Sequence, residues 1–289
     1  MPLLRNIRVT LEMIKWEHSI FALPFALTGA MLAAHGWPPA AKLGWIIVCM
    51  IAARSAAMAF NRWADADLDA ANPRTKMRAI PAGLLTRQFA AGFTMVMAAV
   101  FLLGAWRLNR LTLILSPIVL VVLFLYSYTK RFTRWSHLFL GLALGLAPSG
   151  AWIAIRGSLD PRILVLTAAV LFWVAGFDVL YACQDEAHDR SAGLRSIPAA
   201  LGVTAAFWIA RTMHVIMLGL LVWLVLLFHL GPVAGVGIAA VALLLLWEHL
   251  IVSPRDLTRM NAAFFTMNGV IAVIFFVFVA TDLLTRHHA

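Results

Sequence analysis

The chain has 289 residues, of which 63% are hydrophobic and only 12% are charged, whereas about a quarter of a typical soluble domain is charged. So few charges cannot cover a water-facing surface, which excludes a soluble globular protein and predicts a polytopic membrane protein. The net charge of +10 is typical of basic loops that face anionic lipid head groups, so we expect the lipid bilayer as a partner, with no nucleic acid and no obligate protein partner.

Apolar runs of about 20 residues, the length that crosses a bilayer as a helix, recur along the whole chain. Short polar segments such as HGWPPAAK and RGSLDPR separate them and have the composition of turns. We predict nine spans, at about residues 18–35, 43–61, 88–106, 111–129, 137–156, 162–182, 205–229, 231–251 and 264–284. The expected fold class is therefore an all-α polytopic membrane protein formed by a single domain, residues 1–289.

The distribution of basic residues predicts the orientation of these spans. With the N-terminus in the cytoplasm, 16 of the 23 Lys and Arg residues fall in inner segments and six in outer segments, and Arg54 lies within a span. Positive charge is enriched in cytoplasmic loops, so this bias supports nine spans. We expect a multi-pass protein of the inner (cytoplasmic) membrane.

Two acidic loops hold seven of the 13 acidic residues of the chain, at about residues 61–83 and 178–200. The first reads NRWADADLDAANPRTKMRAIPAG and the second DVLYACQDEAHDRSAGLRSIPAALG. The shared RAIPA and RSIPA segments indicate a weak internal repeat. Four spans separate the loops, an even number, so both face the cytoplasm and the repeat is a parallel one.

The spacing of the acidic residues predicts two carboxylate ladders. Asn61, Asp65 and Asp69 are four residues apart, so a continuing helix places them on one face, and Asp185 and Asp189 share a face in the same way. Facing carboxylates repel one another unless cations lie between them, and oxygen-only ligands favour Mg²⁺ or Ca²⁺. Basic residues on the same side complete a predicted diphosphate site: Arg74, Lys76, Arg78, Lys130, Arg131 and Arg195.

Two other interpretations account for acidic residues at a membrane. The acids and bases of one loop can neutralise each other as a solvated cap, although the recurrence of the pattern in a second loop disfavours this. A cation-coupled transporter also places acidic residues along its ion path. Here, however, the acids lie at helix ends, and the inverted repeat with broken helices that marks many transporters is missing.

These motifs resemble the two signatures of the UbiA superfamily of intramembrane aromatic prenyltransferases. The first is Asn61-x₃-Asp65-x₃-Asp69 followed by NPRT and IPAG, and the second runs from Asp178 through YA to Asp185, Asp189 and GLRS. The segment YSYTKR is similar to the Tyr-x₃-Lys-Arg segment of the family. One departure is Arg62, where many members have Asp. The Asn-Arg form looks most like bacterial 4-hydroxybenzoate polyprenyltransferase-like proteins, some of which serve a futalosine-type menaquinone route.

The resemblance implies nine helices around a central cavity that is capped by the two acidic loops. It implies Mg²⁺ as cofactor, held by Asn61, Asp65, Asp69, Asp185 and Asp189, and bound to the diphosphate of a polyprenyl donor. Charge-assisted hydrogen bonds to that diphosphate would come from Arg74, Arg78, Lys130 and Arg195.

Three further residues receive catalytic roles. Tyr126 and Tyr181 would stabilise the allylic cation through their ring faces. Asp178 would remove the ring proton or orient a ring hydroxyl. Arg54, two turns before Asn61, would bind the carboxylate of the acceptor, although a buried ion pair with Asp178 or Asp65 explains it equally well.

The expected function is Mg²⁺-dependent transfer of a polyprenyl group from polyprenyl diphosphate to a small aromatic acceptor, in ubiquinone or menaquinone biosynthesis. The first choice of acceptor is 4-hydroxybenzoate. The alternatives are the same reaction on 1,4-dihydroxy-6-naphthoate, or a cation-coupled membrane transporter.

Overall fold

The computed structural model describes residues 2–15, 19–257, 260 and 267–286, and nearly all of them lie in helices. Of these residues, eight helices are long and apolar enough to cross a membrane. They are α3 (Ala40–Ala64), α5 (Arg87–Leu108), α6 (Arg110–Thr129), α7 (Ser136–Arg156), α8 (Ile163–Ala182), α11 (Val203–Leu227), α12 (Pro232–Ile251) and α14 (Asn268–Arg286). The predicted all-α polytopic fold is therefore confirmed.

The first and last predicted spans differ in detail from the helices found. The span predicted at 18–35 corresponds to α2 (Ser19–Ala34), an apolar helix shorter than the other eight. The span predicted at 264–284 corresponds to α14, and its first residues, 264–266, lie outside the described part of the chain.

An additional helix, α1 (Pro2–Ile14), precedes the spans and was not predicted. Its Met13 and Ile14 are buried in a cluster with Ala59, Leu85 and Ala90, whereas Arg8 and Glu12 form an exposed ion pair. Thirteen residues are too few to cross a bilayer, and one apolar face with one charged face is typical of a helix that lies along a surface. A search for apolar runs does not detect such a helix, because the mean hydropathy of its residues is low.

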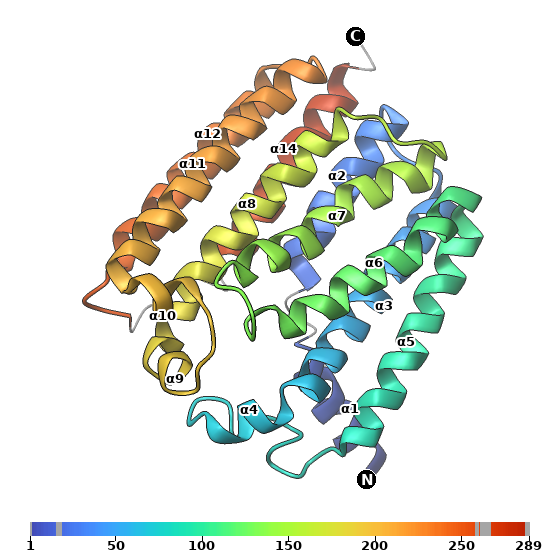
Figure 1. The fold of residues 1–289 in the computed structure, drawn as a ribbon. Helices are drawn as coiled ribbons and strands as arrows, with labels where there is room; N and C mark the ends of the chain where they lie inside the picture. Colours follow the sequence, from blue (N-terminus) through green and yellow to red (C-terminus); the bar gives the residue numbers. More distant parts are fainter. Residues whose placement is uncertain (1, 16–18, 258–259, 261–266, 287–289) are drawn as a thin grey trace.

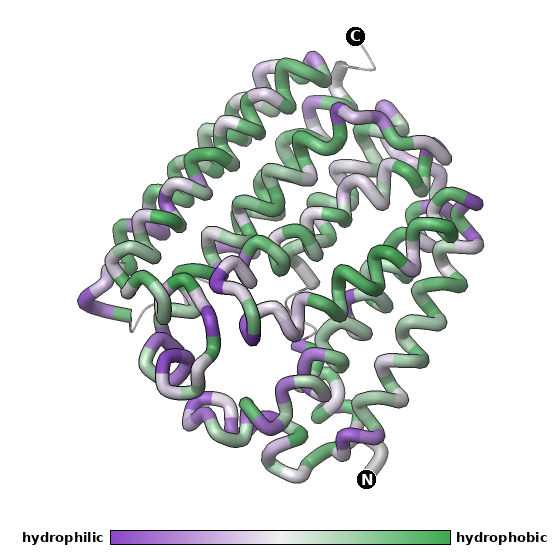
Figure 2. Tube along the Cα trace, viewed as in Figure 1, coloured by the Kyte–Doolittle hydropathy of each residue, from purple (hydrophilic) through white to green (hydrophobic). Residues whose placement is uncertain are grey.

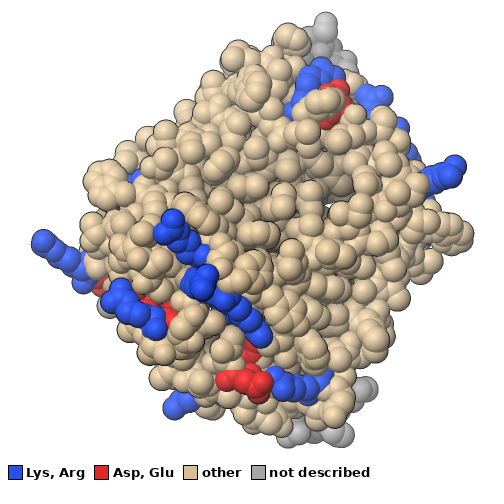
Figure 3. All heavy atoms as spheres, in the orientation of Figure 1, with Lys and Arg blue, Asp and Glu red and all other residues tan. Residues whose placement is uncertain are grey.

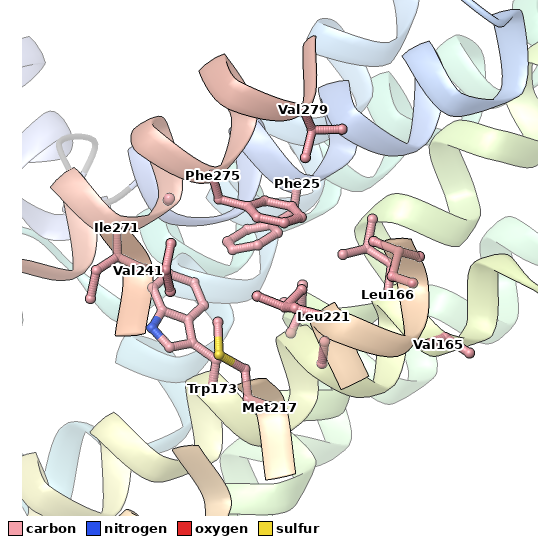
Figure 4. Packing of buried hydrophobic residues seen from close by; sticks show 14 of the residues in the cluster. Phe25, Val165, Leu166, Trp173, Met217, Leu221, Val241, Ile271, Phe275 and Val279 are labelled. Atoms are coloured by element: carbon pink, nitrogen blue, oxygen red, sulfur yellow. The ribbon is translucent and has the colours of Figure 1, made fainter. Parts of the chain in front are cut away.

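The largest hydrophobic core among the described residues joins α2, α8 and α14 through aromatic rings in contact (Figure 4). The ring of Phe25 lies 5.0 Å from that of Trp173 and stacks 5.3 Å from that of Phe275, measured between centroids. Pairs in such geometry add about 0.5–1.5 kcal/mol beyond the area they bury.

The backbones of α7 and α8 pack in close contact. A Cβ atom added to Gly141 of α7 would lie 2.3 Å from the carbonyl oxygen of Leu171 in α8. Only glycine permits this approach, so the small residues of α7 set the position of α8. The polar ends of these two helices lie beside the candidate site.

Polar residues gather at the ends of the bundle, most densely at the end that carries α4 (Ala66–Ala71), α9 (Glu186–Ser191) and α10 (Ile197–Leu201) (Figure 2). α3 ends just before α4, and α8 continues through η2 (Cys183–Asp185) into α9, so both acidic loops share this end. α1 lies there too, whereas α14 ends at the opposite end (Figure 1). The loops therefore lie on one side of the bundle, and the assignment of that side to the cytoplasm stays a prediction.

Candidate active site

A cavity of about 590 Å³ opens between the two acidic loops and the adjoining ends of the long helices. Charged side chains are most numerous around this end of the molecule, a smaller group lies at the opposite end, and most of the visible surface between them carries none (Figure 3). Twelve of the 13 site residues predicted above line the cavity: Arg54, Asn61, Asp65, Asp69, Arg74, Arg78, Tyr126, Lys130, Asp178, Tyr181, Asp185 and Asp189.

The first acidic ladder is built by a helix that continues with only a slight interruption. α3 ends at Ala64 and α4 begins at Ala66, while the backbone bonds from Asp65 N to Asn61 O (2.9 Å) and from Asp69 N to Asp65 O (2.7 Å) bridge the junction. Asp65 and Asp69 are buried, and the Asn61 amide donates to Asp65 Oδ2 at 3.0 Å. Asp67 lies off this face, where it forms an exposed ion pair with Arg87.

Basic side chains neutralise both carboxylates of this ladder. Lys130 Nζ lies 3.5 Å from Asp65 Oδ2, and Arg131 Nη2 donates to Asp65 Oδ1 at 3.1 Å. Arg78 Nη1 donates to Asp69 Oδ1 at 2.6 Å. Buried carboxylates need such partners because an unpaired buried charge is strongly destabilising.

Arg62 contributes a further positive charge inside the ladder. Its side chain is buried, and its Nη1 donates to Asn61 Oδ1 at 3.3 Å and lies 3.9 Å from Asp69 Oδ2. Arg62 departs from the family pattern, and these contacts could not be predicted from the sequence.

The second acidic loop is tied to the first by Arg74. Its Nε donates to Asp185 Oδ1 at 2.7 Å, its Nη2 pairs with Asp185 Oδ2, and its Nη1 donates to the Tyr181 hydroxyl at 3.1 Å. Asn72 also donates to Asp185 Oδ1, at 3.2 Å. Burial alone lowers the pKa of the Arg74 guanidinium, but the hydrogen bond and negative charge of Asp185 outweigh it, so the pKa is raised above its ordinary value. Arg74 therefore remains a cation at any working pH.

Asp178 pairs with a histidine that sequence analysis did not select. His137 Nδ1 lies 2.7 Å from Asp178 Oδ2, and both residues line the cavity. The two are 41 residues apart, at the start of α7 and near the end of α8. Only the close packing of these helices brings them together, so no local spacing signals the pair.

Arg54 and Arg195 occupy different surroundings from the other predicted residues. Arg54 Nη2 donates to the carbonyl oxygen of Lys15 at 3.3 Å. The two carboxylates considered as its partners have other partners. Asp65 forms ion pairs with Lys130 and Arg131, and Asp178 is hydrogen-bonded to His137.

Arg195 is the one predicted site residue outside the described cavity lining. Its backbone N–H donates to Lys130 O at 2.7 Å, and its Nη1 donates to Phe132 O at 2.9 Å. It thus holds the segment that follows α6 against the second acidic loop.

A second cavity of about 370 Å³ adjoins the first and is lined mainly by apolar side chains of α3, α6 and α7. The two cavities share Arg54, Asn61 and Tyr126, so a charged compartment and an apolar compartment meet at these residues.

The oxygen-rich donor set suits a hard divalent cation bound together with an anionic ligand. Within the described residues, no three His, Cys, Asp or Glu side chains converge on one metal position. Mg²⁺, however, typically takes only one or two carboxylates and completes its shell with water and substrate phosphate. Asp69 Oδ2 is buried and has no hydrogen-bond partner among the described residues, which leaves one such oxygen available.

Comparison with known proteins places these features in context. The sequence pattern of the UbiA prenyltransferase family matches residues 22–279. The 4-hydroxybenzoate octaprenyltransferase of Cupriavidus necator is 33% identical over 249 residues, 85% of this chain and 86% of that protein.

Two solved structures have a similar fold. The apo structure of a UbiA homolog from Aeropyrum pernix has a TM-score of 0.84 and 34% identity, and the match covers 92% of this chain and 98% of that one. A UbiA homolog from Archaeoglobus fulgidus, bound to DMAPP and Mg²⁺, has a TM-score of 0.74 at 18% identity, over 95% of this chain and 99% of that one.

Proposed function

The chain belongs to the UbiA prenyltransferase family, and from this premise we propose that it transfers a polyprenyl group from a polyprenyl diphosphate to 4-hydroxybenzoate. Membership of the family confirms the resemblance that the motifs predicted. The observation that carries the proposal is the junction of the two cavities, where carboxylates and cations suited to a diphosphate adjoin an apolar compartment suited to an isoprenoid.

Mg²⁺ is the proposed cofactor, held by Asn61, Asp65 and Asp69 on one side and by Asp185 and Asp189 on the other. When bound, it would neutralise the charge that develops on the leaving diphosphate. The buried Asp69 Oδ2, which has no hydrogen-bond partner among the described residues, supports this assignment, as does the Mg²⁺ in the Archaeoglobus fulgidus homolog.

Three basic residues are proposed to bind the diphosphate, and a fourth is proposed to hold one of them in place. Arg74, Arg78 and Lys130 line the cavity and would donate charge-assisted hydrogen bonds to it. Arg195 would act by holding Lys130, since its backbone N–H bonds to the Lys130 carbonyl. Arg74, Arg78 and Lys130 each already face a carboxylate, so these three positive charges are offset before the donor binds.

The reaction begins as the allylic C–O bond of the donor breaks. The ring faces of Tyr126 and Tyr181 would stabilise the resulting cation, by about 0.5–2 kcal/mol each. The surrounding apolar walls exclude water from it. The electron-rich ring of the acceptor then attacks, and Asp178 accepts the ring proton.

The remaining parts of the substrates extend away from the reacting atoms. Arg54 is proposed to bind the acceptor carboxylate, because it lies where the cavities meet. The prenyl tail would enter the apolar cavity, where each buried methylene contributes about 0.8 kcal/mol. The protein spans the membrane several times, and we place its N-terminus and both acidic loops on the cytoplasmic side of the inner membrane because the basic residues are concentrated there.

Prenyl transfer by the purified protein in lipid, with a polyprenyl diphosphate and Mg²⁺, tests the proposal directly. 4-Hydroxybenzoate and 1,4-dihydroxy-6-naphthoate are offered separately, each with and without EDTA. We expect a product with 4-hydroxybenzoate that disappears with EDTA. A product with the naphthoate alone would move the enzyme to the alternative acceptor. An intact donor with both rings, together with cation flux through the protein, would overturn the prenyltransferase proposal in favour of a transporter.

A further inference from the structure

His137 has both ring nitrogens engaged in the described structure. Nδ1 faces Asp178 Oδ2 at 2.7 Å, and Nε2 accepts the backbone N–H of Ile197 at 3.4 Å. A backbone N–H can only donate, so Nε2 must carry the lone pair, and the ring proton must lie on Nδ1, where it is donated to Asp178. The contact with Ile197 therefore selects one tautomer of a neutral imidazole.

This arrangement fixes how Asp178 meets a substrate. The His137 side chain is only 4% exposed, and that of Asp178 is 18% exposed within the cavity. Because His137 occupies Oδ2, a proton from the substrate reaches Asp178 through Oδ1. An imidazole held on both sides cannot rotate, so it restricts the orientation of the carboxylate as well.

The same contact links Asp178 to the second acidic loop. Ile197 is the first residue of α10, and Ser196 before it caps that helix by accepting from Ala199 N at 3.3 Å. The Ser196 side chain also lies close to the carboxylate of Asp189, near enough to interact with it. The dipeptide Ser196–Ile197 therefore contacts the proposed metal ligand Asp189 through its first residue. Through its second residue it contacts His137, the partner of Asp178.

We propose that His137 is a positioning residue for prenyl transfer, which holds Asp178 so that Oδ1 faces the aromatic acceptor. This inference rests on the proposed function. After the new carbon–carbon bond has formed, the C–H bond at the same ring carbon breaks, and its electron pair restores the aromatic ring. The proton passes to Oδ1 of Asp178 and then to water when the product leaves. His137 keeps its own proton throughout.

Two substitutions at His137 separate this role from simple packing. His137→Leu removes the donor, whereas His137→Asn keeps an amide N–H near the place of Nδ1. His229→Asn is the matched control, because it makes the same exchange in the turn after α11 at the opposite end of the bundle, where the positive φ of 50° suits asparagine. Thermal unfolding of each purified variant verifies that it is folded.

The kinetic constants of each variant are measured with unlabelled acceptor and with acceptor deuterated beside its hydroxyl group. For His137→Leu we expect kcat to fall about 10- to 100-fold, the loss typical when an outer hydrogen bond that orients a functional group is removed. KM for the donor should not change. Proton loss should become slow enough to give a primary isotope effect that the wild type lacks, and His137→Asn should restore most of kcat.

Each contrary result has a distinct meaning. Unchanged kcat in His137→Leu, or a loss without an isotope effect and without rescue by His137→Asn, overturns the positioning role while the wild-type activity stands. Absence of transfer by the wild type overturns the proposed function, and this inference with it.

Discussion

The two acidic loops share a repeated sequence pattern but obtain their counterions differently. The carboxylates of the first loop are neutralised from several directions, by Arg78 within the loop and by Lys130 and Arg131 beyond α6. In the second loop, Asp185 depends on Arg74 of the first, and Asp178 has a neutral imidazole as its partner. The first copy thus supplies counterions for both loops, whereas the second carries Asp178, the proposed acceptor of the ring proton.

Breaking the first ladder should have the largest effect. Asp65→Ala removes a proposed metal ligand and leaves Lys130 and Arg131 without the carboxylate that they share. We therefore expect kcat/KM to fall about 10²–10³-fold or more, as when a charge-stabilising group is lost from an active site. The prenyl-transfer assay measures it. Asp67→Ala is the control in the same turn, because the Asp67 side chain is 88% exposed and pairs only at the surface. Equal losses in both variants would contradict the ladder.

Cutting the link between the loops should have the next largest effect. Arg74→Lys keeps the charge but cannot reproduce the paired bonds to Asp185 or the bond to Tyr181. Losing hydrogen bonds to a charged group costs about 1.5–3 kcal/mol, which is roughly a tenfold to hundredfold weaker binding. We expect this weaker binding to raise KM for the donor, which is measured from initial rates. A variant with an unchanged KM would show that the loops do not need this link.

The second loop alone should respond to a change in the packing of α7 against α8. Gly141→Ala forces a Cβ atom against the Leu171 carbonyl, and such overpacking costs about 1–3 kcal/mol of stability. Thermal unfolding should show the loss, and kcat should fall because His137 lies one turn away on α7. Gly150→Ala in the same helix is the control, since nothing lies within 4 Å of its added Cβ. A stable Gly141→Ala variant would mean that the helices can separate freely.

Converting Arg62 to the residue common in the family should have the smallest effect. Arg62→Asp adds a carboxylate beside Asp69 and removes a buried cation, so the Mg²⁺ concentration needed for half-maximal rate should fall, because affinity for such ions rises with the number of ligand charges. This Mg²⁺ concentration is measured by titrating activity with the metal. Arg62→Gln serves as the control, because it removes the positive charge without adding a negative one. A higher Mg²⁺ requirement in the Asp variant would contradict this role.

Features of the fold and the site that depend on local spacing could be predicted from the sequence, whereas features that depend on packing between helices could not. The spans follow from hydropathy over about 20 residues, and the face shared by Asn61, Asp65 and Asp69 follows from the period of the helix. The pair of His137 and Asp178 joins two spans, so no pattern within either one predicts it. α1 escaped detection because it is short and carries charges. Arg195 was expected to bind the diphosphate because it lies in the second motif on the same side of the membrane, but its position in the sequence does not show which way its side chain points.

The pairing of Arg74 with Asp185 has a consequence for selectivity. A small anion that entered alone would have to take Arg74 away from Asp185, and that carboxylate, only 17% exposed, would be left without its counterion. A ligand that arrives with divalent cations compensates both partners at once. If the proposed function holds, the resting contact between the loops would disfavour free phosphate at Arg74 and favour a diphosphate that carries its own divalent cations. Discrimination would then begin before any substrate atom reaches the apolar compartment.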